Sequence, residues 1–160
     1  MKRQEAGFTL VELLVVIAII AIVTGMLTTI FYQFVHVPRW GNARLAVDSD
    51  LRNAGLWLVH DGNEAWRFTT DLPPIYGTFA ITRTGNTTAT VTYRYDEDED
   101  TLWRDYRTAT STTTIGVARH IAQMSDVTFE TGDNIVVVSV AASNGDVSAS
   151  QTYTVTMRVQ

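Results

Sequence analysis

The feature that most constrains this chain is a long apolar run near its N-terminus. From Phe8 to Val37 the only charged residue is Glu12. An α-helix rises about 1.5 Å per residue, so roughly thirty residues span about 45 Å, whereas the hydrocarbon core of a bilayer is about 30 Å thick. In lipid the backbone must satisfy its own hydrogen bonds, so this run is predicted to be a transmembrane helix.

The residues that flank the apolar run indicate its orientation in the membrane and whether it is a secretory signal. Lys2 and Arg3 precede it, which favours a cytoplasmic N-terminus and places the rest of the chain outside. A secretory signal would have an apolar region of about 7–15 residues followed by a small-residue cleavage site. Here the small residue, Gly7, comes before the run. A plain signal anchor is the simpler alternative, but the carboxylate of Glu12 within an apolar helix costs about 2.5–3.5 kcal/mol and usually marks a function.

The segment from Gly7 to Leu13, with the sequence Gly-Phe-Thr-Leu-Val-Glu-Leu, resembles the type IV prepilin leader motif. Type IV pilins and type II secretion pseudopilins share this motif, and the resemblance covers residues 1–35. It implies that a prepilin peptidase cleaves between Gly7 and Phe8 on the cytoplasmic side and methylates the new amine of Phe8. It also implies that the helix packs with other pilin or pseudopilin subunits in the core of a filament.

Physical chemistry supplies a role for Glu12 within that resemblance. Cleavage would leave an ammonium group on Phe8, whose ordinary pKa is about 7.7–8.0. An unpaired carboxylate and an unpaired ammonium are both costly in a bundle of apolar helices. We therefore expect Glu12 of one subunit to pair with the Phe8 amine of a neighbour and to help set the axial register between subunits.

Beyond the apolar run the chain has the composition of an ordinary soluble domain. The expected division is a cleaved leader over residues 1–7, a transmembrane and filament-core helix over 8–37, and an extracytoplasmic domain over 38–160. There is no cysteine, which excludes disulfides and thiolate metal sites. The net charge of −5, without a basic patch, argues against nucleic acid as the main partner. No cofactor is expected.

A second helical pattern opens the extracytoplasmic domain. Pro38 is expected to kink or end the first helix, because proline lacks the backbone donor and crowds the preceding turn. The next helix is predicted over residues 40–59, ending near Gly62. It is indicated by apolar residues at helical spacing: Val47, Leu51, Ala54 and Leu58. The resemblance implies that this part of the long helix packs on a sheet.

The remainder is predicted to be mainly antiparallel strands joined by short turns. Alternation of apolar and polar residues predicts strands over 75–83, 91–95, 102–107, 127–129, 135–141 and 147–159. The last three form a meander, with Asn144-Gly145 as a turn. Irregular segments are expected over 63–74 and 108–114, and a short helix over 117–124. The fold class is therefore α+β: a long N-terminal helix, transmembrane in its first half, packed on antiparallel β-sheet.

Candidate sites for metals or catalysis are weak. Asp96, Asp98 and Asp100 have the 1, 3, 5 spacing of a calcium loop, but Thr101 and Arg107 occupy the positions where such a loop carries glycine and glutamate. A solvated hairpin loop is the alternative. The three histidines lack ligand spacing, and no nucleophile, phosphate-loop or zinc-protease motif occurs. An enzyme is therefore not expected.

The function expected from these features is structural: a pilin-like subunit anchored in the bacterial inner membrane and assembled into a periplasmic or surface filament. Residues 93–104 and 117–129 loosely resemble the J-type minor pseudopilin of type II secretion. The missing cysteines favour a pseudopilin or minor pilin, because many major pilins carry a disulfide-closed loop. The alternatives are a type IV pilus subunit for adhesion, motility or DNA uptake, and a membrane-anchored module that binds a ligand or a secreted substrate.

Overall fold

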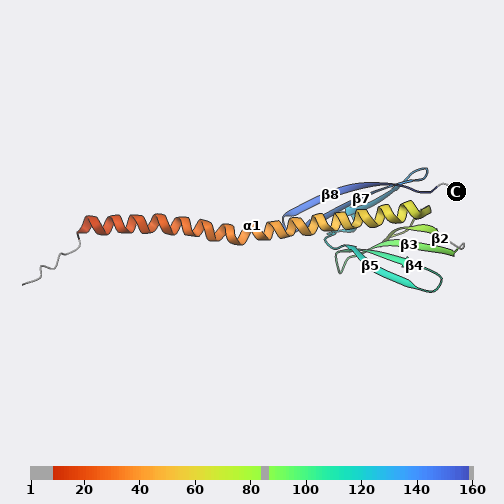
Figure 1. Cartoon of the computed structure of the whole chain (residues 1–160), viewed down its shortest axis with the longest axis horizontal. Helices are drawn as coiled ribbons and strands as arrows, with labels where there is room; N and C mark the ends of the chain where they lie inside the picture. Colours follow the sequence, from red (N-terminus) through yellow and green to blue (C-terminus); the bar gives the residue numbers. More distant parts are fainter. Residues whose placement is uncertain (1–8, 84–86, 159–160) are drawn as a thin grey trace, which may run out of the picture. The chain divides into compact units, whose positions relative to one another are not determined.

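The computed structural model describes residues 9–83 and 87–158 and contains two compact units, Met1–Gly41 and Asn42–Gln160 (Figure 1). The helix α1 (Leu10–Glu64) supplies the described helical residues of the first unit and the opening element of the second. Pro38 lies inside α1, so the helix does not end there as was considered. Proline removes a single intrahelical hydrogen bond, and the bonds of the turns on both sides maintain the helix.

In the second unit, α1 buries one face. Its buried residues repeat at three- and four-residue intervals, as expected for a helix that packs on one side. They are Val47, Leu51, Ala54, Gly55, Leu58, Asp61 and Gly62. The predicted apolar stripe is confirmed, and the helix continues to Glu64, slightly beyond the predicted end.

Five strands form an antiparallel sheet in the order β1-β2-β3-β4-β5. Their bounds are Ala65–Thr70, Ile75–Arg83, Thr87–Asp96, Thr101–Arg107 and Thr112–Ala118. The strands β2, β3 and β4 confirm the predictions over 75–83, 91–95 and 102–107. Alternate residues of these strands face the core, among them Phe79, Ile81, Val91, Tyr93 and Leu102.

The two edge strands of this sheet were not predicted. β1 was missed because a register shift between Ala65 and Arg67 interrupts the alternation that marks a strand. β5 begins within the threonine-rich segment that was expected to be a loop, since threonine is common on the solvent face of strands. The short helix expected over residues 117–124 is also wrong, because Val117 belongs to β5 and the only helical turn nearby among the described residues is η1 (Met124–Asp126).

A second antiparallel sheet has the order β6-β7-β8. Its strands are Val127–Thr131, Ile135–Asn144 and Val147–Thr156. The pairing of Asn144 with Val147 places the β7–β8 turn at Asn144-Gly145, and Gly145 has a φ of 60°, which glycine adopts without strain. The predicted three-stranded meander is confirmed.

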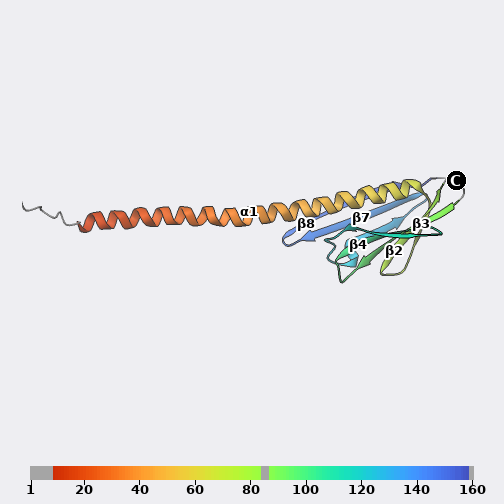
Figure 2. The same ribbon diagram turned by 60° about the horizontal axis from the view of Figure 1, so that its bottom comes forward.

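Within the second unit, both sheets pack against the last part of α1 and against each other (Figures 1 and 2). The clearest contact between the sheets is Phe129 of β6, whose ring lies 5.5 Å from that of Phe68 in β1 and 5.6 Å from that of Tyr76 in β2. A single apolar core therefore joins one helix to two sheets, and the α+β prediction is confirmed.

Two glycines allow α1 to approach the strand β8 closely. A Cβ atom at Gly55 would overlap the ring of Tyr153, and one at Gly62 would overlap the side chain of Val155. At Gly62 the added atom would also lie 3.6 Å from Phe79 in β2. Because glycine weakens a helix interior by about 0.5–1 kcal/mol, its occurrence here has a packing reason.

Replacing Gly62 with alanine should lower the free energy of unfolding by about 1–3 kcal/mol, the usual cost of adding atoms to a packed core. Denaturant unfolding of the full chain in detergent, followed by circular dichroism, would measure this. Gly41→Ala is the matched control, because nothing lies within 4 Å of a Cβ at that helical position. That control should be neutral or slightly stabilising, and equal losses for both variants would contradict the packing explanation.

Candidate assembly site

The described part of the N-terminal segment begins with Thr9, which caps α1. The backbone N–H of Glu12 donates to the carbonyl of Thr9 at 3.1 Å and lies 3.3 Å from its Oγ1, and the N–H of Leu13 donates to the same carbonyl at 3.2 Å. A threonine at this position satisfies donors that a helix start leaves free. Gly7 and Phe8, the residues expected to be cleaved and methylated, lie outside the described residues.

The carboxylate of Glu12 is in the first turn of α1. The N-terminal end of a helix carries a partial positive charge, so an acidic residue there is favoured by about 0.3–1 kcal/mol. The structure therefore gives Glu12 a local stabilising role in addition to the assembly role expected from the sequence. Its side chain is exposed within the described chain and is free to meet a group from another molecule.

The side chains that follow Glu12 are apolar and exposed. Within the described residues one helix, α1, is long and apolar enough to cross a membrane, and its most apolar window is not buried at all. Two hydroxyls in this segment are satisfied by the helix itself, because Thr28 donates to the carbonyl of Thr24 at 2.9 Å and Thr29 to that of Gly25 at 3.1 Å. An apolar surface of this extent requires lipid or other apolar helices around it.

The second unit carries a buried polar cluster that fixes α1 to the five-stranded sheet. Asp61 of α1 accepts two hydrogen bonds from Arg104 of β4, at 2.6 and 2.5 Å, and one from the hydroxyl of Tyr93 in β3, at 2.6 Å. Asp61 is fully buried and Arg104 is 6% exposed. The guanidinium of Arg104 also lies over the ring of Trp57, 4.4 Å from its centroid. Burial, and then the neighbouring Asp61 carboxylate, raise the pKa of the Tyr93 hydroxyl well above its ordinary value, so this hydroxyl stays a donor.

A second polar cluster holds the loop after β5 against α1. One carboxylate oxygen of Asp50 accepts the backbone N–H groups of Arg119 and His120, at 3.0 and 3.1 Å, and lies 2.7 Å from Nδ1 of His120. The other ring nitrogen of His120 lies 3.2 Å from the side-chain amide of Asn144. The contacts of His120 are those of a structural residue.

The three aspartates considered for calcium lie at the β3–β4 turn. Asp96 accepts the backbone N–H of Asp98 at 3.2 Å and lies 3.5 Å from Arg94, while Asp100 lies within 3.4 Å of the hydroxyl of Tyr95. Across residues 9–83 and 87–158, no group of three or more His, Cys, Asp or Glu side chains could hold a metal ion. The structure therefore does not bring the three carboxylates together, and the turn has the form of a hairpin loop.

Comparison with known proteins bears on the N-terminal segment. A family model described as the prokaryotic N-terminal methylation motif matches residues 2–28. No curated protein and no solved structure matches the chain. Residues 2–28 of the chain thus carry the prepilin-type N-terminal motif that type IV pilins and pseudopilins share. The motif implies processing by prepilin peptidase, anchoring in the inner membrane through the apolar helix, and assembly with pilin subunits.

Proposed function

We propose that this chain is a minor pilin-like subunit of a filament built at the inner membrane, with type II protein secretion as the favoured system. The observation that carries the proposal is the combination of a prepilin-type motif with an exposed apolar helix that has one acid in its first turn. A membrane anchor alone needs no carboxylate within its apolar span, and an acid in lipid is costly.

In this proposal residues 1–7 are a leader, cut between Gly7 and Phe8, and Phe8 becomes the N-methylated terminus. Residues 8–37 serve first as a single transmembrane span and later as the filament-core helix. Residues 38–160 lie outside the cytoplasm. Lys2 and Arg3 support this orientation because basic residues favour the cytoplasmic side.

The carboxylate of Glu12 is proposed to pair with the terminal amine of Phe8 on a neighbouring subunit. Its place in the first turn of α1 supports this role, because it lies only a few residues after the proposed cleavage point. In an apolar helix bundle the pair removes two otherwise costly charges at once. Since only one register satisfies both groups, the pair would also fix the axial stagger of adjacent subunits.

The choice of filament rests on the composition of the chain. The absence of cysteine favours a pseudopilin or minor pilin, and the loose resemblance to the J-type minor pseudopilin favours type II secretion. A type IV pilus subunit is the second candidate, because the N-terminal motif is common to both systems. Recovery of the chain in filaments sheared from the cell surface would favour the pilus, whereas loss of protein export without loss of surface filaments in a deletion strain would favour secretion.

Mass analysis of the N-terminal peptide of the mature protein tests the central claim. The expected product begins at Phe8 and carries one additional methyl group on its amine. A strain without prepilin peptidase is the control and should retain Met1 and the leader. A mature protein that begins at Met1, or one cut after the apolar helix, would overturn the proposed function.

A further inference from the structure

The last strand of the chain has an edge without the usual protection. β8 is an outer strand of its sheet and, among the described strands, pairs only with β7. Edge strands commonly carry charges, prolines or bulges that prevent other strands from pairing with them. β8 has ten residues without a charge or a proline, and its pairing with β7 shows no register shift. The backbone donors and acceptors on its outer edge are therefore available to another extended strand.

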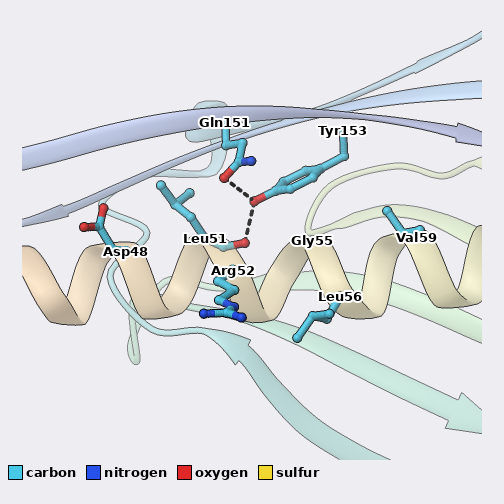
Figure 3. Close-up of a pocket in the computed structure, with 8 residues that line it drawn as sticks. All are labelled: Asp48, Leu51, Arg52, Gly55, Leu56, Val59, Gln151 and Tyr153. Atoms are coloured by element: carbon cyan, nitrogen blue, oxygen red, sulfur yellow. Dashed lines mark hydrogen bonds between the residues drawn. The ribbon is translucent and has the colours of Figure 1, made fainter.

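A groove of about 630 Å³ lies beside this edge (Figure 3). The helix α1 lines it with Asp48, Leu51, Arg52, Gly55, Leu56 and Val59, and β8 lines it with Gln151 and Tyr153. Figure 3 shows Tyr153 reaching from β8 to α1, where its hydroxyl donates to the carbonyl of Leu51. The strand edge and the helix therefore form two walls of one groove, and the ring of Tyr153 joins them.

The helix wall of the groove is apolar, with one free cation. Leu56 is 65% exposed and Val59 is 38% exposed. Asp48 already pairs with Arg44 at 3.1 Å on the helix surface. Arg52, by contrast, has no ion pair with any residue that the structure describes. A segment that fits this groove would be extended, with apolar side chains toward the helix and a carboxylate near Arg52.

We propose that an extended segment of a different pilin-like subunit adds to β8 as a fourth strand and fills this groove. The inference rests on the proposed function, because that function supplies the neighbouring subunits. Main-chain hydrogen bonds to β8 would provide affinity, and alternate side chains facing Leu56 and Val59 would provide specificity. Charge complementarity with Arg52 selects segments that carry an acidic residue at that point. The groove is lined by α1, and the N-terminal part of the same helix is the proposed site of subunit assembly.

Antiparallel pairing of β8 with the β8 strand of a second copy does not fit the same arrangement. Two β8 edges that pair with each other antiparallel are related by a two-fold axis. Within the second unit α1 runs alongside β8 (Figure 3), so that axis would also reverse the direction of α1 in the partner. Residue 42 of the two chains would then face opposite directions, although both chains enter their domains from the same membrane.

Site-specific photo-crosslinking in the full-length chain, in cells that contain the assembly system, tests the proposal. A photoreactive residue is placed at Leu56 in one strain and at Gln151 in another, and the crosslinked peptides are sequenced. Both positions should link to one contiguous segment of another protein with a prepilin-type N-terminus. Leu72 is the matched control, because it is 84% exposed but lies outside the groove.

Arg52→Glu should reduce the crosslink yield from Leu56 at least fivefold, while Arg107→Glu on β4 should leave it unchanged. Crosslinks to another copy of this chain, or no groove-specific crosslink in chains that are processed and present in filaments, would overturn the inference. An unprocessed chain, detected by its intact Met1, would instead show that the proposed function has failed. The two failures are therefore distinguished in the same samples.

Discussion

Replacing Arg104 with methionine should lower the free energy of unfolding by about 3–5 kcal/mol. Methionine fills similar space but leaves the carboxylate of Asp61 buried without its partner, and removing one member of a buried ion pair has a cost of that order. Among the residues that the structure describes, Asp61 would keep only the hydroxyl of Tyr93 as a side-chain hydrogen-bond partner. Denaturant unfolding of the full chain in detergent, followed by near-ultraviolet circular dichroism, measures the loss.

Two controls separate this effect from a general loss of charge or packing. Arg44→Met breaks the exposed ion pair with Asp48 and should change the free energy of unfolding by less than about 1 kcal/mol, because surface pairs contribute little. The triple variant Asp61→Leu, Tyr93→Phe, Arg104→Met should recover most of the stability, since replacing a whole buried ionic cluster with apolar residues is often neutral. A loss of under about 1 kcal/mol for Arg104→Met alone would contradict the proposed contribution of the pair.

Replacing Glu12 with leucine should leave membrane insertion intact and reduce assembly at least tenfold. Leucine makes the span more apolar, so insertion is not impaired. In the filament, however, the amine of Phe8 on the neighbouring subunit would lose its proposed partner within apolar surroundings. A tenfold loss corresponds to about 1.4 kcal/mol, which is a modest share of the cost of an unpaired buried charge. Immunoblots of the chain that co-purifies with its partner subunits, relative to the total chain in the membrane fraction, would measure this loss in either filament system.

The controls for this variant remove other acidic groups and test the charge alone. Glu12→Gln keeps the shape of the side chain and should show a similar defect. Glu64→Gln, at the other end of α1, removes only a partly exposed contact with His60 and should assemble normally. The processed mass of each variant shows whether the peptidase still acts. Normal assembly of fully processed Glu12→Leu would refute the pairing.

The fold could be predicted from sequence wherever periodicity was continuous. Residues 91–96 alternate without interruption and residues 147–156 do so apart from Gln151, and the structure has β3 and β8 there. Periodicity failed where geometry interrupts it, as at the register shift between Ala65 and Arg67 in β1. It also misled over residues 117–124, where apolar residues at helical spacing belong to a strand end and a loop that pack on the same core.

The candidate assembly site was visible in sequence because its residues are consecutive. The buried cluster was not, because Asp61 and Arg104 are distant in the chain and meet only after the sheet closes on the helix. A partial signal did exist. Asp61 follows Leu58 by three positions on the buried stripe of α1. Arg104 follows Leu102 by two positions and therefore lies on the same inner face of β4. Two opposite charges at core-facing positions predict that each has a partner, but they do not say which.

The order of strands in the two sheets has a consequence for how the chain folds. Every strand pair joins neighbours along the chain, from β1 to β5 and from β6 to β8. Hairpins can therefore form locally, and the long-range step is the closure of both sheets on α1, which is synthesised before them. Chains dominated by local contacts fold faster than those that must find distant partners. Since there is no cysteine to oxidise, the proposed folding outside the cytoplasm does not wait for disulfide exchange, and its slowest stage should be docking on a helix that is already in place.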